Sequence, residues 1–159
     1  FYRRSEDGTL TKTSAFFDEY HEPDALYEGG GAGLYSTVRD YLRFTQMLAN
    51  GGELDGVRII GRKTIDLMRS NQLNETQLND FRNSYLAGYG YGLGVRTMMD
   101  PAAGNYNGSV GEFGWTGGAG TYTAIDPSEG FSIVYMHQMM PNMEEYHHHR
   151  VRAVAYGCI

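Results

Sequence analysis

The segment GEFGWTGGAGTYTAIDP, residues 111–127, constrains the fold more than any other part of the chain. Its first ten residues include five glycines, and its second half, TYTAI, alternates as a β-strand does before the turn signal Asp126-Pro127. Glycine inside a strand weakens it unless another group has to approach the backbone closely. The segment therefore predicts a strand with an accessible backbone, and the alternative interpretation is a sharply bent hairpin.

The chain divides into four regions by composition and pattern. Residues 1–35 read as loops with a short strand, 36–75 as a helical segment, 86–140 as an antiparallel sheet and 143–159 as a C-terminal helix. A length of 159 residues suffices for one domain. Because the sequence begins FYRRSEDG without a methionine and ends in mid-pattern at VAYGCI, we expect a single incomplete domain, part of a longer protein.

Two helices are predicted in the helical segment. The first runs from residue 36 or 37 to about residue 50, because Thr37 and Asp40 have capping-box spacing and Gly51-Gly52 end the pattern. Its expected apolar stripe contains Val38, Tyr41, Leu42, Leu48 and either Phe44 or Thr45. Asp55-Gly56 predicts a tight turn, and the second helix covers roughly residues 63–73. The polar stretch NETQLNDFRNS is then expected to be a connection.

The sheet region contains a second glycine pattern. In GYGYGLGVRTM, glycine occupies positions 88, 90, 92 and 94, so at the two-residue period of a strand one face is bare backbone. We expect a helix, such as the terminal one, to pack closely on that face. DPAAGNYNG is expected to be a loop, and FSIVYMHQM, residues 131–139, a last strand.

Composition excludes several classes of function. A net charge of −6 argues against binding to nucleic acid or to anionic membrane surfaces, because both require a basic patch. Cys158 is the sole cysteine, so neither a disulfide framework nor a cysteine-based zinc site forms within one chain. No apolar run approaches the roughly 18 residues that span a bilayer, so no membrane span is expected in this chain.

Three further motifs have simple interpretations. GVRIIGRKT departs from a phosphate-binding P-loop because Arg62 stands where the motif needs lysine, so a loop-to-helix junction is favoured. His147, His148 and His149 are adjacent and cannot converge on one metal ion from a helix; an exposed polar helix start is expected, and no metal site. GGGAGLYS is an anion-binding nest or, as we favour, a tight turn into the first helix.

No serine in the chain carries the signature of an activated nucleophile. The motifs G-x-S-x-G, S-x-x-K, Y-x-N and S-x-N are all absent. The nearest is Ser36-Thr37-Val38-Arg39, whose arginine does not lose its proton to act as a base. We therefore predict neither a nucleophile nor a general base in this chain.

Four stretches together resemble the serine β-lactamase-like family, which includes penicillin-binding proteins, DD-peptidases, AmpC-type β-lactamases and related esterases. Residues 29–70 resemble the region between its active-site motifs, and YGYGLGV the first strand of its carboxy-terminal sheet. FGWTGGAGTYTAIDP resembles the strand that carries the third motif, and FSIVYMHQMMP the closing strand. The resemblance implies an α+β fold, here the carboxy-terminal part: an antiparallel sheet, its final helix and two helices of the helical region.

The resemblance also implies site residues. The third motif, Lys-Thr-Gly in many members, reads Trp115-Thr116-Gly117 here, and these three residues would contact the substrate. The backbone N–H of Gly118 would form half of the oxyanion hole, which requires a close approach of the backbone to the substrate carbonyl. Tryptophan in place of lysine removes a charge and favours an esterase or amidase-like enzyme over an efficient β-lactamase.

The implied function is that of a serine hydrolase acting on an ester, amide or lactam carbonyl through an acyl-enzyme. The family's S-x-x-K and Y-x-N motifs lie upstream of the region resembled, so this chain alone is expected to be inactive. The alternative is a non-catalytic module that binds a peptide or ligand on the same scaffold, for example by strand addition.

The expected partners follow from the same interpretation. They are a small-molecule or peptide substrate, the N-terminal part of the same protein, and a second copy if an apolar sheet face is left uncovered. No metal or organic cofactor is implied. The compartment stays open between the bacterial envelope and the cytoplasm.

Overall fold

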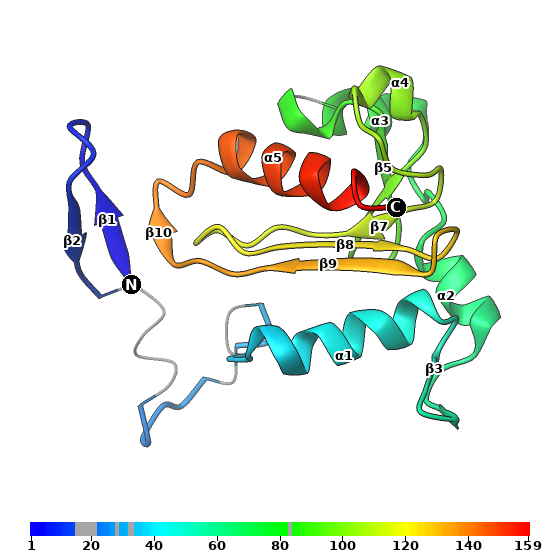
Figure 1. Ribbon diagram of the computed structural model, residues 1–159, viewed down its shortest axis with the longest axis horizontal. Helices are drawn as coiled ribbons and strands as arrows, with labels where there is room; N and C mark the ends of the chain where they lie inside the picture. The colour runs from blue at the N-terminus through cyan, green and yellow to red at the C-terminus, as the bar shows by residue number, and fades with distance from the viewer. Residues whose placement is uncertain (15–21, 28, 32–33, 83) are drawn as a thin grey trace.

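A computed structural model describes residues 1–14, 22–27, 29–31, 34–82 and 84–159. Its centre is a five-stranded antiparallel sheet in the order β5-β6-β7-β8-β9, with helix α1 on one face and helix α5 on the other (Figure 1). This is the α+β arrangement expected. The helices are α1 Val38–Ala49, α2 Arg62–Met68, α3 Glu75–Phe81, the 3₁₀ turn η2 Ser84–Leu86, α4 Pro101–Gly104 and α5 Glu144–Tyr156. The strands are β1 Tyr2–Arg4, β2 Leu10–Lys12, β3 Glu53–Leu54, β4 Val57–Arg58, β5 Tyr89–Tyr91, β6 Arg96–Met98, β7 Phe113–Gly114, β8 Tyr122–Asp126, β9 Phe131–Tyr135 and β10 Met139–Met140.

Each face of the sheet carries its own buried cluster. On the α1 side the buried cluster consists of Met47, Leu48, Ala49, Ile65, Phe113 and Ile125, and on the α5 side of Tyr122, Ala124, Ile133 and Tyr156. The hairpin β1–β2 joins β10 in a separate three-stranded sheet beside this layer (Figure 1). Within the described residues, no helix combines the length and the apolar character needed to span a bilayer.

Helix α1 begins where predicted, but the residues that face the sheet differ in part from the predicted apolar stripe. The Thr37 hydroxyl oxygen accepts a hydrogen bond from Asp40 N at 3.1 Å, which caps the helix. The residues it buries are Thr45, Met47, Leu48 and Ala49. Val38, Leu42 and Phe44 of the predicted stripe remain substantially exposed. The stripe was therefore wrong in part, and α1 carries an apolar surface that no described residue covers.

The segment after α1 is more helical than expected. Helix α2 ends at Met68 instead of continuing to about residue 73, and the predicted connection contains helix α3. Asn74 and Gln77 start α3 by exchanging side-chain-to-backbone hydrogen bonds of 3.0 Å. None of its seven residues is fully buried, so the helix has no strong apolar stripe to signal it. The predicted turn at Asp55-Gly56 joins β3 to β4, with positive φ at both residues.

The glycine-alternating stretch is a hairpin and not one continuous strand. Strand β5 ends at Tyr91, and the chain returns in β6 with Tyr91 opposite Arg96. A Cβ atom at Gly90 or Gly92 would overlap Asn71 or the carbonyl of Met68. The end of α2 and the residues after it, and not the terminal helix, therefore pack against Gly90 and Gly92, whereas Gly88 packs against Asp100 and Gly104. The predicted loop DPAAGNYNG also contains a short helix, α4, capped by Asp100.

The segment 111–127 also forms a hairpin, in which β7 and β8 are joined by a turn at Gly117–Gly120. Four of its five glycines are enclosed by neighbours. A Cβ atom at Gly111, Gly114, Gly117 or Gly120 would overlap, respectively, Arg69, the carbonyl of Thr123, the Thr121 hydroxyl or the His137 ring. Gly118 differs, because a Cβ atom built there meets no atom of the described residues within 4 Å. Packing thus explains the other four glycines and leaves Gly118 facing open space.

Candidate active site

The turn that carries Gly118 has a fixed peptide orientation. Gly120 N donates to Gly117 O at 2.9 Å, and Gly117 N donates to Thr121 O at 2.8 Å. The Gly117 carbonyl and the Gly118 N–H belong to one trans peptide and point in opposite directions. The bond to Gly117 O therefore directs the Gly118 N–H out of the turn. Among the described residues this N–H has no hydrogen-bond acceptor.

A groove of about 580 Å³ lies beside the turn. Trp115, Thr116 and Gly117 line it together with strand residues of β8 and β9. Leu34 and Tyr35 line it from the segment that leads into α1, and Tyr41 lines it from α1 itself. Gly118 follows the lining residue Gly117 at the margin of the groove and is exposed. The volume falls within the range of about 300–1,000 Å³ typical of small-molecule sites. Three of the four predicted site residues thus line one groove, and Gly118 follows them in the chain.

The groove is mostly apolar and aromatic, with His137, Gln138, a serine and three threonines as its polar lining residues. Its described lining residues include no lysine, arginine, aspartate or glutamate. Trp115 is 39% exposed, and its ring meets that of Tyr91 edge-on at a centroid distance of 5.4 Å. Ser36 also lines the groove, but its hydroxyl donates to Thr37 O at 3.4 Å, and no described base lies against it. In the described part of the chain no group of three or more metal-ligating side chains comes together.

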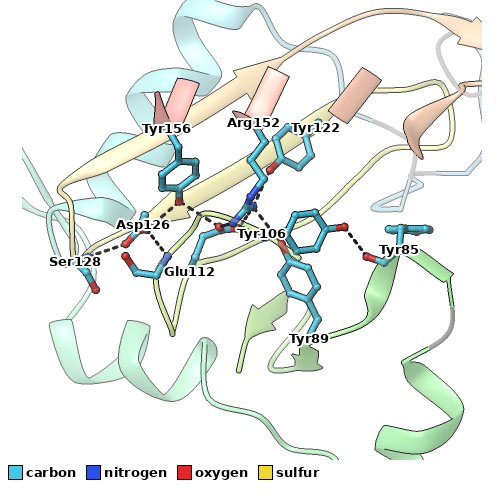
Figure 2. A network of polar contacts seen from close by, with 10 residues as sticks. Tyr85, Tyr89, Tyr106, Glu112, Tyr122, Asp126, Ser128, Arg152 and Tyr156 are labelled. Carbon is cyan, nitrogen blue, oxygen red and sulfur yellow. Dashed lines mark hydrogen bonds and ion pairs between the residues drawn. The ribbon is translucent and has the colours of Figure 1, made fainter. Parts of the chain in front are cut away.

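Behind the hairpin, a buried polar cluster fastens α5 to the sheet (Figure 2). Glu112, the residue before β7, forms an ion pair with Arg152 of α5, and the two side chains are 1% and 2% exposed. Arg152 Nη1 also donates to the hydroxyls of Tyr89 and Tyr122 at 3.1 Å each. The Tyr156 hydroxyl donates to Asp126 Oδ2 at 2.8 Å. Tyr89 and Tyr122, which are 2% and 3% exposed, therefore have polar partners within the core.

The expectation of an exposed polar start to the last helix was wrong for His148. This side chain is 7% exposed, its Nε2 lies 2.9 Å from Gly120 O, and its ring stacks on Tyr122. His148, Arg152 and Tyr156 are spaced by four, so they share the face of α5 that meets the sheet. The four-residue spacing was the signal in the sequence for this buried helix face. A search for apolar periodicity does not detect it, because two of the three residues are polar.

Burial shifts the pKa values of the groups in this cluster. It raises the pKa of Tyr89, Tyr122 and Tyr156, with the Glu112 carboxylate acting in the same direction. Burial also raises the pKa of Tyr106 to about 12. For His148 burial lowers the pKa, and the nearby Arg96 guanidinium adds to the effect. The cluster therefore favours neutral tyrosines and a neutral His148.

Alkaline pH is expected to destabilise the protein through these tyrosines. In the unfolded chain each ionises near the ordinary pKa of about 10, whereas the folded state retains the proton to higher pH. Stability is therefore intact below pH 10 and decreases above it, by about 1.4 kcal/mol per pH unit for each buried tyrosine. Urea unfolding of the full-length protein at pH 9, 10 and 11 measures this slope. Tyr89→Phe should reduce the slope, and equal stability at pH 9 and 11 would refute this explanation.

Known structures share this fold. EstCE1, a hydrolase with promiscuous acyltransferase activity, superposes with a TM-score of 0.78 at 20% identity over 98% of this chain and 42% of its own. Simvastatin synthase (LovD) from Aspergillus terreus gives a TM-score of 0.76 at 19% identity, over 99% of this chain and 42% of its own. The chain therefore has the β-lactamase/transpeptidase-like fold, as its C-terminal part.

Sequence comparison identifies the family. A family model described as Beta-lactamase matches residues 2–156, and the chain belongs to that family. Protein Rv1367c of Mycobacterium tuberculosis is 37% identical over 131 residues, which are 77% of this chain and 32% of that protein. A putative D-alanyl-D-alanine carboxypeptidase of Escherichia coli K12 is 27% identical over 79% of this chain and 27% of its own length. The chain thus spans about a third of the length of these curated relatives.

Proposed function

We propose that the full-length protein is a serine hydrolase that cleaves an ester or a related acyl bond through an acyl-enzyme. In this proposal the Gly118 N–H binds the carbonyl oxygen as it becomes anionic, and Trp115, Thr116 and Gly117 form the adjoining wall of the substrate site. The nucleophilic serine and its base come from the part of the protein that precedes this chain, in the S-x-x-K and Y-x-N motifs implied by the family.

The Gly118 N–H, which has no acceptor among the described residues, is the observation that carries the proposal. It lies at the margin of a groove of ligand size, on a peptide whose carbonyl is held by Gly120 N. A backbone donor fixed in advance costs no reorganisation when charge develops, and one such donor contributes about 10²–10³-fold to the rate. A Cβ atom at Gly118 would meet no described atom within 4 Å, so the turn itself is not packed over at this residue.

The chemistry of the groove favours an uncharged acyl group. A substrate carboxylate, as in a peptide C-terminus, is best bound by a cation, and none of the described lining residues is lysine or arginine. Trp115 replaces the lysine of the family motif and presents an indole ring, which suits an apolar acyl chain. We therefore propose short apolar esters as substrates in preference to D-alanyl-D-alanine peptides or β-lactams.

A fluorophosphonate probe tests this function on the full-length protein. We expect covalent labelling of one serine upstream of this chain, slowed by a short aryl ester and much less by a D-alanyl-D-alanine peptide. Preincubation with unlabelled phosphonate is the control for specific labelling. If the folded protein is not labelled and hydrolyses no ester, the enzyme proposal fails, and the non-catalytic binding module becomes the better interpretation.

A further inference from the structure

We infer that the C-terminal segment from β10 into α5 holds the Gly118 turn in its working orientation, and that His148 is the principal positioning residue. The inference rests on the proposed function, because it gives this buried histidine a role in aiming the oxyanion donor. His148 does not line the groove. It acts on the turn through the carbonyl of Gly120, and not on the Gly118 N–H itself.

Three consecutive carbonyls of the turn are held from this segment. Asn142 Nδ2 donates to Gly118 O at 3.3 Å, Met139 N donates to Ala119 O at 3.0 Å, and His148 Nε2 lies 2.9 Å from Gly120 O. Because a carbonyl only accepts, His148 carries its proton on Nε2 in this contact. With the internal bond from Gly120 N to Gly117 O, every carbonyl from residue 117 to 120 has a partner.

The turn depends on such support because of its composition. Three of its four residues are glycine, the residue with the greatest backbone freedom in the absence of outside contacts. The turn also lies at the end of the β7–β8 hairpin, where Gly118 is exposed. A donor for an oxyanion has to be held close to its working position, because a misplacement of about 1 Å can cost about 10²-fold in rate.

His148 is the most firmly placed of the three supports. It lies one helical turn before Arg152, whose ion pair with Glu112 fastens α5 to the strand that leads into the turn. Its ring stacks on Tyr122 at a centroid distance of 4.8 Å, and Tyr122 pairs with Thr116 across the hairpin. The orientation of the turn is thereby linked to the docking of α5.

His148→Ala, His148→Gln and a control variant test the inference in the full-length protein. Alanine removes the donor, whereas the Gln side-chain amide places an N–H near the position of Nε2. His149→Ala is the matched control, because His149 stacks on Tyr106 at 5.1 Å and has no contact with the turn among the described residues. Asn142→Ala removes a second support at a less buried site.

We expect His148→Ala to lower kcat for an ester by about 10-fold or more, with KM little changed. The substitution alters the orientation of the Gly118 N–H, which acts on the transition state, and does not alter substrate binding. His148→Gln should recover most of the loss, and His149→Ala should behave as the parent protein. Asn142→Ala should lower kcat less, and it also tests the inference if His148→Ala does not fold.

Two outcomes would overturn the inference. Either kcat is unchanged in folded His148→Ala and Asn142→Ala, or His148→Gln is as impaired as His148→Ala, which would assign the effect to loss of ring packing. These results are separable from failure of the proposed function. If removal of the Gly118 N–H leaves the rate unchanged, the proposed function fails, whatever the result for His148→Ala. If removal of the Gly118 N–H abolishes activity but His148→Ala is fully active, only the inference about His148 fails.

Discussion

Replacing Gly118 by proline in the full-length protein is expected to lower kcat for an ester substrate by about 10²–10³-fold. Proline removes the backbone N–H, which is the proposed oxyanion donor, and places its Cδ methylene where that hydrogen stood. Gly118 is the second residue of a four-residue turn, the position that proline favours, and it does not have a positive φ. The space around a Cβ atom at this position is also open.

Gly118→Ala is the matched control, because alanine adds a Cβ atom and keeps the N–H. Its kcat should stay within a few-fold of the parent value, as no described atom lies within 4 Å of the new Cβ. Rates are measured with a chromogenic short-chain ester, and circular dichroism verifies that both variants are folded. Equal rates for the proline and alanine variants would mean that another group stabilises the oxyanion.

Replacing Glu112 by glutamine is expected to reduce the free energy of unfolding by about 3–5 kcal/mol. The substitution keeps the size of the side chain and removes its charge, so the Arg152 guanidinium is left buried without a carboxylate partner. Such a loss is a large fraction of the roughly 5–15 kcal/mol that stabilises a typical domain. We therefore expect a lower unfolding temperature and release of α5 from the sheet.

Asp55→Asn is the matched control for Glu112→Gln. It also converts an acid to its amide, but the Arg43–Asp55 ion pair is 59% and 67% exposed, and such pairs contribute about 0–1 kcal/mol. Replacing both members, as in Glu112→Leu with Arg152→Met, should recover much of the stability because neither charge of the pair is left without the other. Urea unfolding of the three variants measures these differences. Similar stability of Glu112→Gln and Asp55→Asn would show that the buried ion pair does not fasten α5.

Local signals were sufficient for the beginnings and ends of some elements. Thr37 and Asp40 located the start of α1, and Asp55-Gly56 located a turn, because each effect acts over a few residues of backbone. Helix α3 was missed because it buries none of its residues, so an apolar pattern could not identify it. The prediction of a continuous strand through Gly94 was wrong, because an alternating pattern alone does not show where the chain reverses direction.

The candidate site was only partly accessible to sequence reasoning. Resemblance to a family motif selected Trp115–Gly118, but the glycines at 111 and 120 are required by distant neighbours, Arg69 and His137. The contacts of His148 with Gly120 and of Arg152 with Glu112 join residues 28 and 40 positions apart. No local rule pairs such residues, since the pairing depends on how α5 crosses the sheet.

The most direct test of the central claim is a crystal structure of the full-length protein after reaction with a phosphonate ester. A phosphonyl oxygen then occupies the position of the oxyanion on the modified serine. We predict that this oxygen lies about 2.7–3.1 Å from Gly118 N, within the groove lined by Trp115, Thr116 and Gly117. An adduct whose oxygen is bound by other donors, with Gly118 N pointing elsewhere, would contradict the account.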